Sequence, residues 1–168
     1  FDANTGDLSI SKRVGWTQVT MEMDPASCEM GECTDGAFLT LLKDKLDTIT
    51  EDTVLVFHMI GSHGPAYFMR YPESYRKFTP DCRTSEFAKC TDEEIRNAYD
   101  NSIAFTDHVL ASTVDILNAA QDRVTPAMFF MSDHGESLGE NGLYLHGAPY
   151  LLPDAVYVLP EVNRYAKK

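Results

Sequence analysis

The sequence predicts an α/β fold in which helices cover both faces of a parallel sheet. Two amphipathic helical patterns alternate with two short apolar runs, in the order helix, strand, long loop, helix, strand. The 168 residues are 43% hydrophobic, which is enough for one domain with a core of its own. No internal repeat or low-complexity segment interrupts this order, so we expect residues 1–168 to form a single domain.

The first helix is predicted over residues 36–49, where Thr34 or Asp35 stands at the position of an N-cap. Its apolar side chains recur at three- and four-residue spacing: Phe38, Leu41, Leu42, Leu46 and Ile49. The run TVLVFHM follows at residues 53–59. Because this run is apolar on both faces, we expect a strand that helices cover on each side.

The second helix is predicted over residues 92–120, and Thr91 with Glu94 forms a capping box at its start. Its predicted apolar stripe consists of Ile95, Tyr99, Ile103, Thr106, Leu110, Val114 and Leu117. The run PAMFFM at residues 126–131 is predicted to be a second buried strand.

A long loop, residues 61–90, connects the first strand to the second helix. Loops of this length inside a compact domain are usually functional or cross-linked. Between Tyr67 and Phe78 it carries basic and aromatic side chains, namely Arg70, Tyr71, Tyr75, Arg76 and Lys77. These side chains fit contact with lipid head groups and a solvated loop equally well.

The four cysteines form two local pairs, Cys28 with Cys33 and Cys82 with Cys90. Neither spacing is that of a structural zinc site. Charged residues flank both pairs, which favours disulfides in surface loops over the alternative of four reduced thiols in the core. Disulfides persist in oxidising compartments, so the pattern indicates the periplasm or the exterior of a cell.

The formal net charge of −12 argues against a nucleic-acid partner or an anionic membrane surface. No apolar stretch is long enough to span a membrane, and the first residues do not have the pattern of a signal peptide. The chain has no initiating Met, so we expect a soluble fragment of a longer protein. An anionic substrate would have to be held locally, by a metal ion or by backbone N–H groups.

Both predicted strands end in a His-Gly corner, His63-Gly64 and His134-Gly135. Ligands of open α/β sheets bind beyond the carboxyl ends of the strands, so we expect the two corners to converge. Asp133 and His134 supply an oxygen and a nitrogen ligand for zinc, and His146 is a further candidate. A single Asp-His-Gly is also an ordinary turn.

Three other residues are expected to have no part in chemistry. His58 lies inside the first predicted strand and His108 inside the long helix, so both are predicted to be structural or surface histidines. Gly135 to Gly139 matches the G-x-S-x-G pattern of serine hydrolases. However, Ser137 lies beyond the strand-to-helix turn where a nucleophile would stand, and it lacks the usual order of acid and histidine after it.

Three stretches resemble a known family: GSHGPAYFMRYPESYRKFTPDC, YDNSIAFTDHVL and FFMSDHGESLGENGLYLHGAPY. They are similar to the periplasmic catalytic domain of the lipid A phosphoethanolamine transferases, which include the mobile colistin-resistance enzymes. The resemblance is dense over residues 54–150, and the residues after Pro153 do not clearly follow the pattern of the family. It implies an alkaline-phosphatase-like or sulfatase-like fold, present here in part.

The resemblance also implies a zinc-dependent reaction. In that family a zinc-activated threonine takes phosphoethanolamine from phosphatidylethanolamine and passes it to a lipid A phosphate at the periplasmic face of the inner membrane. Asp133 and His134 match the zinc-binding pair, in a predicted metal-binding loop at residues 132–150. His63 and His146 match histidines that hold the phosphate or a second zinc, and Glu136 lies where a second metal can be contacted.

The resemblance leaves parts of the machinery outside this chain. The threonine nucleophile, a zinc-binding glutamate and the membrane helices are expected upstream, and the protein is expected to be monomeric. We therefore predict that the isolated 168 residues bind zinc weakly and turn over no substrate. Two alternatives stay open: a sulfatase- or phosphatase-type hydrolase that uses the same metal corner, and a binding module without chemistry.

Overall fold

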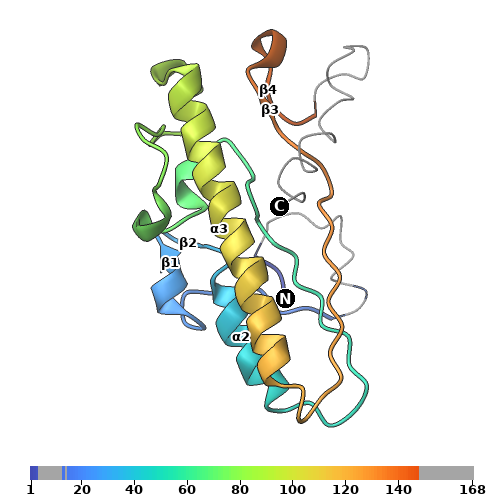
Figure 1. Ribbon diagram of the computed structural model, residues 1–168. Helices are drawn as coiled ribbons and strands as arrows, with labels where there is room; N and C mark the ends of the chain where they lie inside the picture. The colour runs from blue at the N-terminus through green and yellow to red at the C-terminus, as the bar shows by residue number, and fades with distance from the viewer. Residues whose placement is uncertain (4–12, 14, 148–168) are drawn as a thin grey trace.

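The computed structural model describes residues 1–3, 13 and 15–147. Two helices among the described residues lie side by side, and extended segments run along them (Figure 1). Helix α2 spans Ala37–Leu46 and helix α3 spans Asp92–Ala119. The described residues also form two short antiparallel hairpins: β1 (Cys28–Glu29) with β2 (Glu32–Cys33), and β3 (Ser137–Leu138) with β4 (Tyr144–Leu145).

Helix α2 is shorter than its apolar pattern predicts and is capped differently. Phe38, Leu41, Leu42 and Leu46 are buried as expected, but the helix ends at Leu46. Gly36 occupies the N-cap position, and no side chain caps the helix. The prediction of Thr34 or Asp35 as the cap is wrong, because the Asp35 carboxylate bonds the backbone of Ile60 and Gly61 instead.

Helix α3 begins as predicted, with both halves of the Thr91–Glu94 capping box formed. Its buried face, however, lies beside the predicted stripe, since Ile103 and Val114 are exposed. The buried residues are Ile95, Ala98, Asn101, Ser102, Phe105 and Val109. Asn101 explains the difference: its side chain accepts from Lys77 N–H and Phe78 N–H, each at 2.8 Å, and these bonds offset the cost of burying a polar residue.

The extended segment at residues 53–59 is only partly the predicted strand. Leu55, Phe57 and Met59 turn towards the helices, while Val54 is 88% and Val56 is 68% exposed. Parallel bridges join Asp2 to Gln18 and to His58, so neighbouring extended segments run in the predicted parallel sense. Among the described residues, helices cover this segment on one side only.

The prediction of a buried strand at residues 126–131 is wrong for the described structure. The segment is extended and irregular, and Phe129 is 86% and Met131 71% exposed. A strand needs a ladder of hydrogen bonds to a neighbour, and no described segment pairs with this one. Val124, just before it, packs with Leu42 and Leu46 of α2.

Both predicted disulfides are present, and each closes a local loop. Cys28–Cys33 closes the β1–β2 hairpin, and Cys82–Cys90 closes the loop before α3. Residues 61–90 contain three short 3₁₀ turns, at Tyr67–Met69, Glu73–Tyr75 and Phe87–Lys89. Within the described part of the chain, neither helix is apolar enough along its length to cross a membrane.

Candidate active site

Three histidine rings from separate segments meet near the β3–β4 hairpin. The ring centroid of His146 lies 4.1 Å from that of His134 and 4.9 Å from that of His63. The His63 and His134 centroids are 6.4 Å apart. His63 follows the extended segment at 53–59, His134 follows the segment at 126–131, and His146 follows β4. The two segment ends that the sequence predicts to converge therefore lie together.

Each of the three rings has its Nδ1 atom engaged. Nδ1 of His63 lies 2.7 Å from the carbonyl oxygen of Gly64, and Nδ1 of His134 lies 2.9 Å from that of Gly135. A carbonyl oxygen only accepts, so these Nδ1 atoms donate a proton. Nδ1 of His146 likewise bonds Oε1 of Glu136 at 2.9 Å. Neutral rings in this arrangement keep Nε2 free to bind a cation.

Glu136 is the buried carboxylate of the cluster, with its side chain 4% exposed. Its Oε1 bonds Nδ1 of His146 and accepts a hydrogen bond from the N–H of Gly64 at 3.4 Å. Its Oε2 has no hydrogen-bond partner among the described residues, and neither has the buried hydroxyl of Tyr67. Burial raises the pKa of Tyr67, and the charge of Glu136 adds to this, so the phenol stays protonated.

The donor set fits a divalent cation such as zinc. One ligand atom each from His134, Glu136 and His146 lies within 4.8 Å of the others. Imidazole nitrogen and carboxylate oxygen are common zinc ligands, and the free Oε2 of Glu136 is a buried acceptor that a cation would satisfy.

Asp133 stands beside this group rather than within it. Its side chain is 78% exposed, and its Oδ1 accepts the N–H of His134 at 2.9 Å. Its Oδ2 lies 3.8 Å from Nε2 of His134, so the two predicted zinc ligands face one another across a short gap.

The residues expected to be bystanders lie outside the cluster. Nδ1 of His58 pairs with Oδ1 of Asp2 at 3.0 Å, and His108 packs on Tyr75 with ring centroids 4.8 Å apart. Ser137 lies in β3, opposite Leu145 of β4, and not at a strand-to-helix turn.

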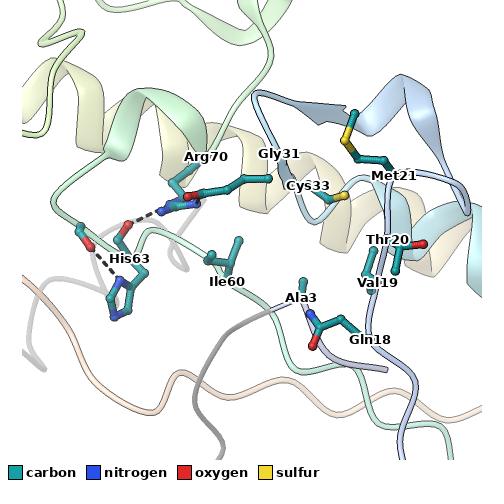
Figure 2. A pocket seen from close by; sticks show the side chains of 12 residues that line it. Ala3, Gln18, Val19, Thr20, Met21, Gly31, Cys33, Ile60, His63 and Arg70 are labelled. Atoms are coloured by element: carbon teal, nitrogen blue, oxygen red, sulfur yellow. Dashed lines mark hydrogen bonds and ion pairs between the residues drawn. The ribbon is translucent and has the colours of Figure 1, made fainter.

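Two residues that support the site are absent from the sequence-based candidates. Asp35 accepts from Ile60 N–H at 2.9 Å and Gly61 N–H at 2.8 Å, and burial raises its pKa to about 6. Arg70, only 7% exposed, donates to the carbonyl of His63 at 2.9 Å (Figure 2). Neither residue carries a sequence signal of this role, because Asp35 stands at a helix start and Arg70 lies among loop cations.

Residues 67–78 fit neither of the two open alternatives, contact with lipid head groups or a solvated loop, along their whole length. Arg70 and Tyr71 are buried, and Arg76 pairs with Asp81 at 2.6 Å and with Glu73 at 3.1 Å. His63 and Arg70 line a cavity of about 350 Å³. Figure 2 shows the side chains around it.

Comparison with known proteins identifies the family to which the chain belongs. The sulfatase family profile matches residues 4–162. The chain belongs to the sulfatase family. This membership and the structural matches below confirm the predicted α/β, alkaline-phosphatase-like fold class.

The similar proteins are phosphoethanolamine transferases. Phosphoethanolamine transferase EptA of Salmonella typhimurium is 42% identical over 160 residues, which are 95% of this chain and 29% of that protein. Phosphatidylethanolamine transferase Mcr-2 of Escherichia coli is 46% identical over 119 residues, 70% of this chain and 22% of that protein. The predicted resemblance is confirmed.

A solved structure also matches, the soluble domain of lipooligosaccharide phosphoethanolamine transferase A from Neisseria meningitidis. It has a TM-score of 0.77 and 40% identity, over 89% of this chain and 45% of that one. The chain thus spans less than a third of the length of these curated relatives and under half of this soluble domain.

Proposed function

We propose that this chain carries part of the active site of a zinc-dependent transferase, which moves phosphoethanolamine from phosphatidylethanolamine to a phosphate of lipid A. The observation that carries the proposal is the convergence of His63, His134 and His146 around buried Glu136. The names of the similar proteins supply the group that is transferred.

In this proposal Asp133 and His134 hold the zinc ion, with His146 and Glu136 close enough to contribute to it or to a second metal. The bound ion would lower the pKa of the attacking hydroxyl and neutralise charge on the phosphoryl oxygens. The attacking threonine would come from a part of the protein outside these 168 residues.

The chain's own residues bind and orient the phosphoryl group. His63 keeps Nε2 free, because its Nδ1 is held by the Gly64 carbonyl, and its ring centroid lies 4.9 Å from that of His146. Glu136 fixes the ring of His146 in the same way, because its Oε1 bonds the Nδ1 atom of that ring. In its protonated form each of these rings can keep Nδ1 on its partner and donate its Nε2–H to a phosphoryl oxygen, without a reorganisation cost at the moment of transfer.

The reaction would take place at the periplasmic face of the inner membrane, with the protein acting as a monomer. The two disulfides fit this compartment, because the periplasm is oxidising.

Product analysis tests this function against hydrolysis, which the sulfatase family also permits. The full-length protein is incubated with phosphatidylethanolamine carrying a labelled head group and with lipid A. We expect the label on lipid A. Release of the label only as free phosphoethanolamine would make the protein a hydrolase and contradict the proposal.

Zinc affinity of the 168-residue chain is a separate test. We expect calorimetric titration to give binding weaker than nanomolar, because the chain supplies an incomplete ligand set, and we expect His134→Ala to abolish it. Nanomolar affinity in the isolated chain would contradict the expected weakness.

A further inference from the structure

The turn that carries His63 is held in place by side chains from other parts of the chain. Residues 60–64 leave the extended segment, and a hydrogen bond from His63 N–H to the Ile60 carbonyl at 3.2 Å closes the turn. Gly61 sits at φ +55°, a conformation that glycine adopts more readily than other residues. The direction of the His63 ring therefore depends on what fixes this short backbone segment.

Asp35 fixes the start of the turn. The residue is 3% exposed, and its two carboxylate oxygens accept the N–H groups of Ile60 and Gly61 separately, at 2.9 and 2.8 Å. The carboxylate comes from the residue just before the N-cap of α2, which is packed into the core through Phe38 and Leu41.

Arg70 fixes the end of the turn. Its Nε donates to the His63 carbonyl at 2.9 Å, and its side chain is 6% exposed (Figure 2). A second nitrogen of the same planar group donates to Oε2 of Glu32 at 2.6 Å. Because the guanidinium is a rigid fork, fixing one nitrogen on Glu32 also fixes the direction in which Nε meets His63.

Glu32 lies in the disulfide-closed β1–β2 hairpin, next to Cys33. Its side chain is 46% exposed, so it can be changed with little effect on packing. A buried guanidinium that loses the carboxylate it bonds is left with an unpaired N–H group, and although the charge of Asp35 stays near it, Arg70 is then held less firmly.

Arg76 provides a matched comparison on the same loop. It pairs with two carboxylates, Asp81 and Glu73, but its side chain is 33% exposed and its bonds lead away from residues 60–64. A change at Arg76 removes ion pairs of an arginine from the same loop without touching the turn of His63.

We propose that Arg70, held by Glu32, is a positioning residue for His63: it fixes the backbone of the turn so that the His63 ring keeps Nδ1 on the Gly64 carbonyl and stays beside the ring of His146. The inference rests on the proposed function only for the role of His63 in binding the phosphoryl group. The position itself is a property of the chain.

The tautomer of His63 in the 168-residue chain tests the position without any enzymatic activity. Nitrogen-15 NMR of histidine-labelled protein reports which ring nitrogen carries the proton. We expect the Nδ1-protonated form of His63 in the wild type and in Arg76→Gln, and a loss of that form in Arg70→Gln and Arg70→Lys. An unchanged His63 signal in both Arg70 variants would overturn the proposal.

Glu32→Gln decides the matter if the Arg70 variants do not fold. It is expected to reduce the Nδ1-protonated form in the same direction, because a neutral amide accepts from Arg70 more weakly than the carboxylate does. A folded Glu32→Gln chain with the wild-type His63 signal would overturn the proposal.

Kinetics in the full-length protein show what the position contributes to the reaction. Arg70→Lys is expected to lower kcat by roughly 10- to 100-fold, as loss of a supporting contact behind a ligand does, and Arg76→Lys to leave kcat unchanged. Unchanged kcat in Arg70→Lys, beside an altered His63 signal, would refute the use of His63 but not its positioning. Loss of the proposed transferase activity as a whole, in the product analysis, would leave the NMR result standing.

Discussion

Gly64, in the turn of His63, packs against Leu145 of β4, the residue before His146. Gly64→Ala should push this turn and the β3–β4 hairpin apart. A Cβ atom at this position would lie 2.4 Å from Cδ2 of Leu145 and 3.0 Å from the ring of Tyr67. Carbon atoms pack at about 3.5–4.0 Å, so Leu145 would have to move by about 1 Å or more. His146 follows Leu145 directly, so any part of this shift that the Leu145 side chain does not take up would move His146 as well.

The cost of Gly64→Ala follows from that overlap. Overpacking in a buried site costs about 1–3 kcal/mol, and the reduced freedom of alanine in the unfolded chain returns about 0.4–1 kcal/mol, so we expect a net loss of about 1–2 kcal/mol. For a chain of this size that loss corresponds to a decrease in melting temperature of roughly 2–8 °C.

A double-mutant cycle with Leu145→Ala isolates the overlap, because alanine at 145 lacks the Cδ2 atom. Chemical denaturation of the four proteins should show that Gly64→Ala costs about 1 kcal/mol less in the Leu145→Ala background. Strict additivity, or a Gly64→Ala protein as stable as the wild type, would refute the reasoning.

Three further predictions concern buried ionisable groups and are checked through the free energy of unfolding. For Asp81 and Asp35 it is measured against pH, and for Tyr67 it is compared between the variant and the wild type. Burial alone would raise the pKa of Asp81, but hydrogen bonds from Tyr71 and Arg76 outweigh it and lower the pKa, so its stabilisation should be lost as the pH falls below about 4; an unchanged acid limb in Asp81→Asn would contradict this. Burial raises the pKa of Asp35 to about 6 from its usual 3.8, so the free energy of unfolding should decrease as the pH rises between these values, and Asp35→Asn should remove that decrease. Tyr67→Phe removes a buried hydroxyl that has no partner among the described residues and should stabilise the chain by about 1 kcal/mol; a loss of stability would show that the hydroxyl is bonded.

Local signals predicted the helices better than the faces they bury. The Thr91–Glu94 box is complete within four residues, and it places the start of α3 correctly. The buried face of α3 depends on Asn101, whose partners at Lys77 and Phe78 are more than twenty residues away. Hydropathy treats such an asparagine as a surface residue, so the predicted stripe is displaced towards Ile103 and Val114.

The strands show a different limit. Phe129 and Met131 have the composition of a buried strand, but burial requires a covering layer, and the described residues supply helices on one side of the extended segments only. Composition reports what a segment can bury and not which neighbours are present to bury it.

The site could be predicted as far as its histidines, because His63 and His134 each follow an apolar run that a parallel sheet would bring together. Its supports could not be predicted. Arg70 is held by Glu32, which is 38 residues away in sequence, and a pairing over that distance leaves no periodic trace. In a basic and aromatic loop, Arg70 resembles its solvated neighbours.

The most direct test of the account is the rate of head-group transfer from fluorescent phosphatidylethanolamine by the full-length protein, comparing His134→Ala with His108→Ala. His134 lies in the cluster, while His108 lies on α3 against Tyr75. The account predicts loss of turnover in His134→Ala and wild-type turnover in His108→Ala. Equal turnover in His134→Ala and the wild type would contradict a reaction that depends on zinc at this cluster.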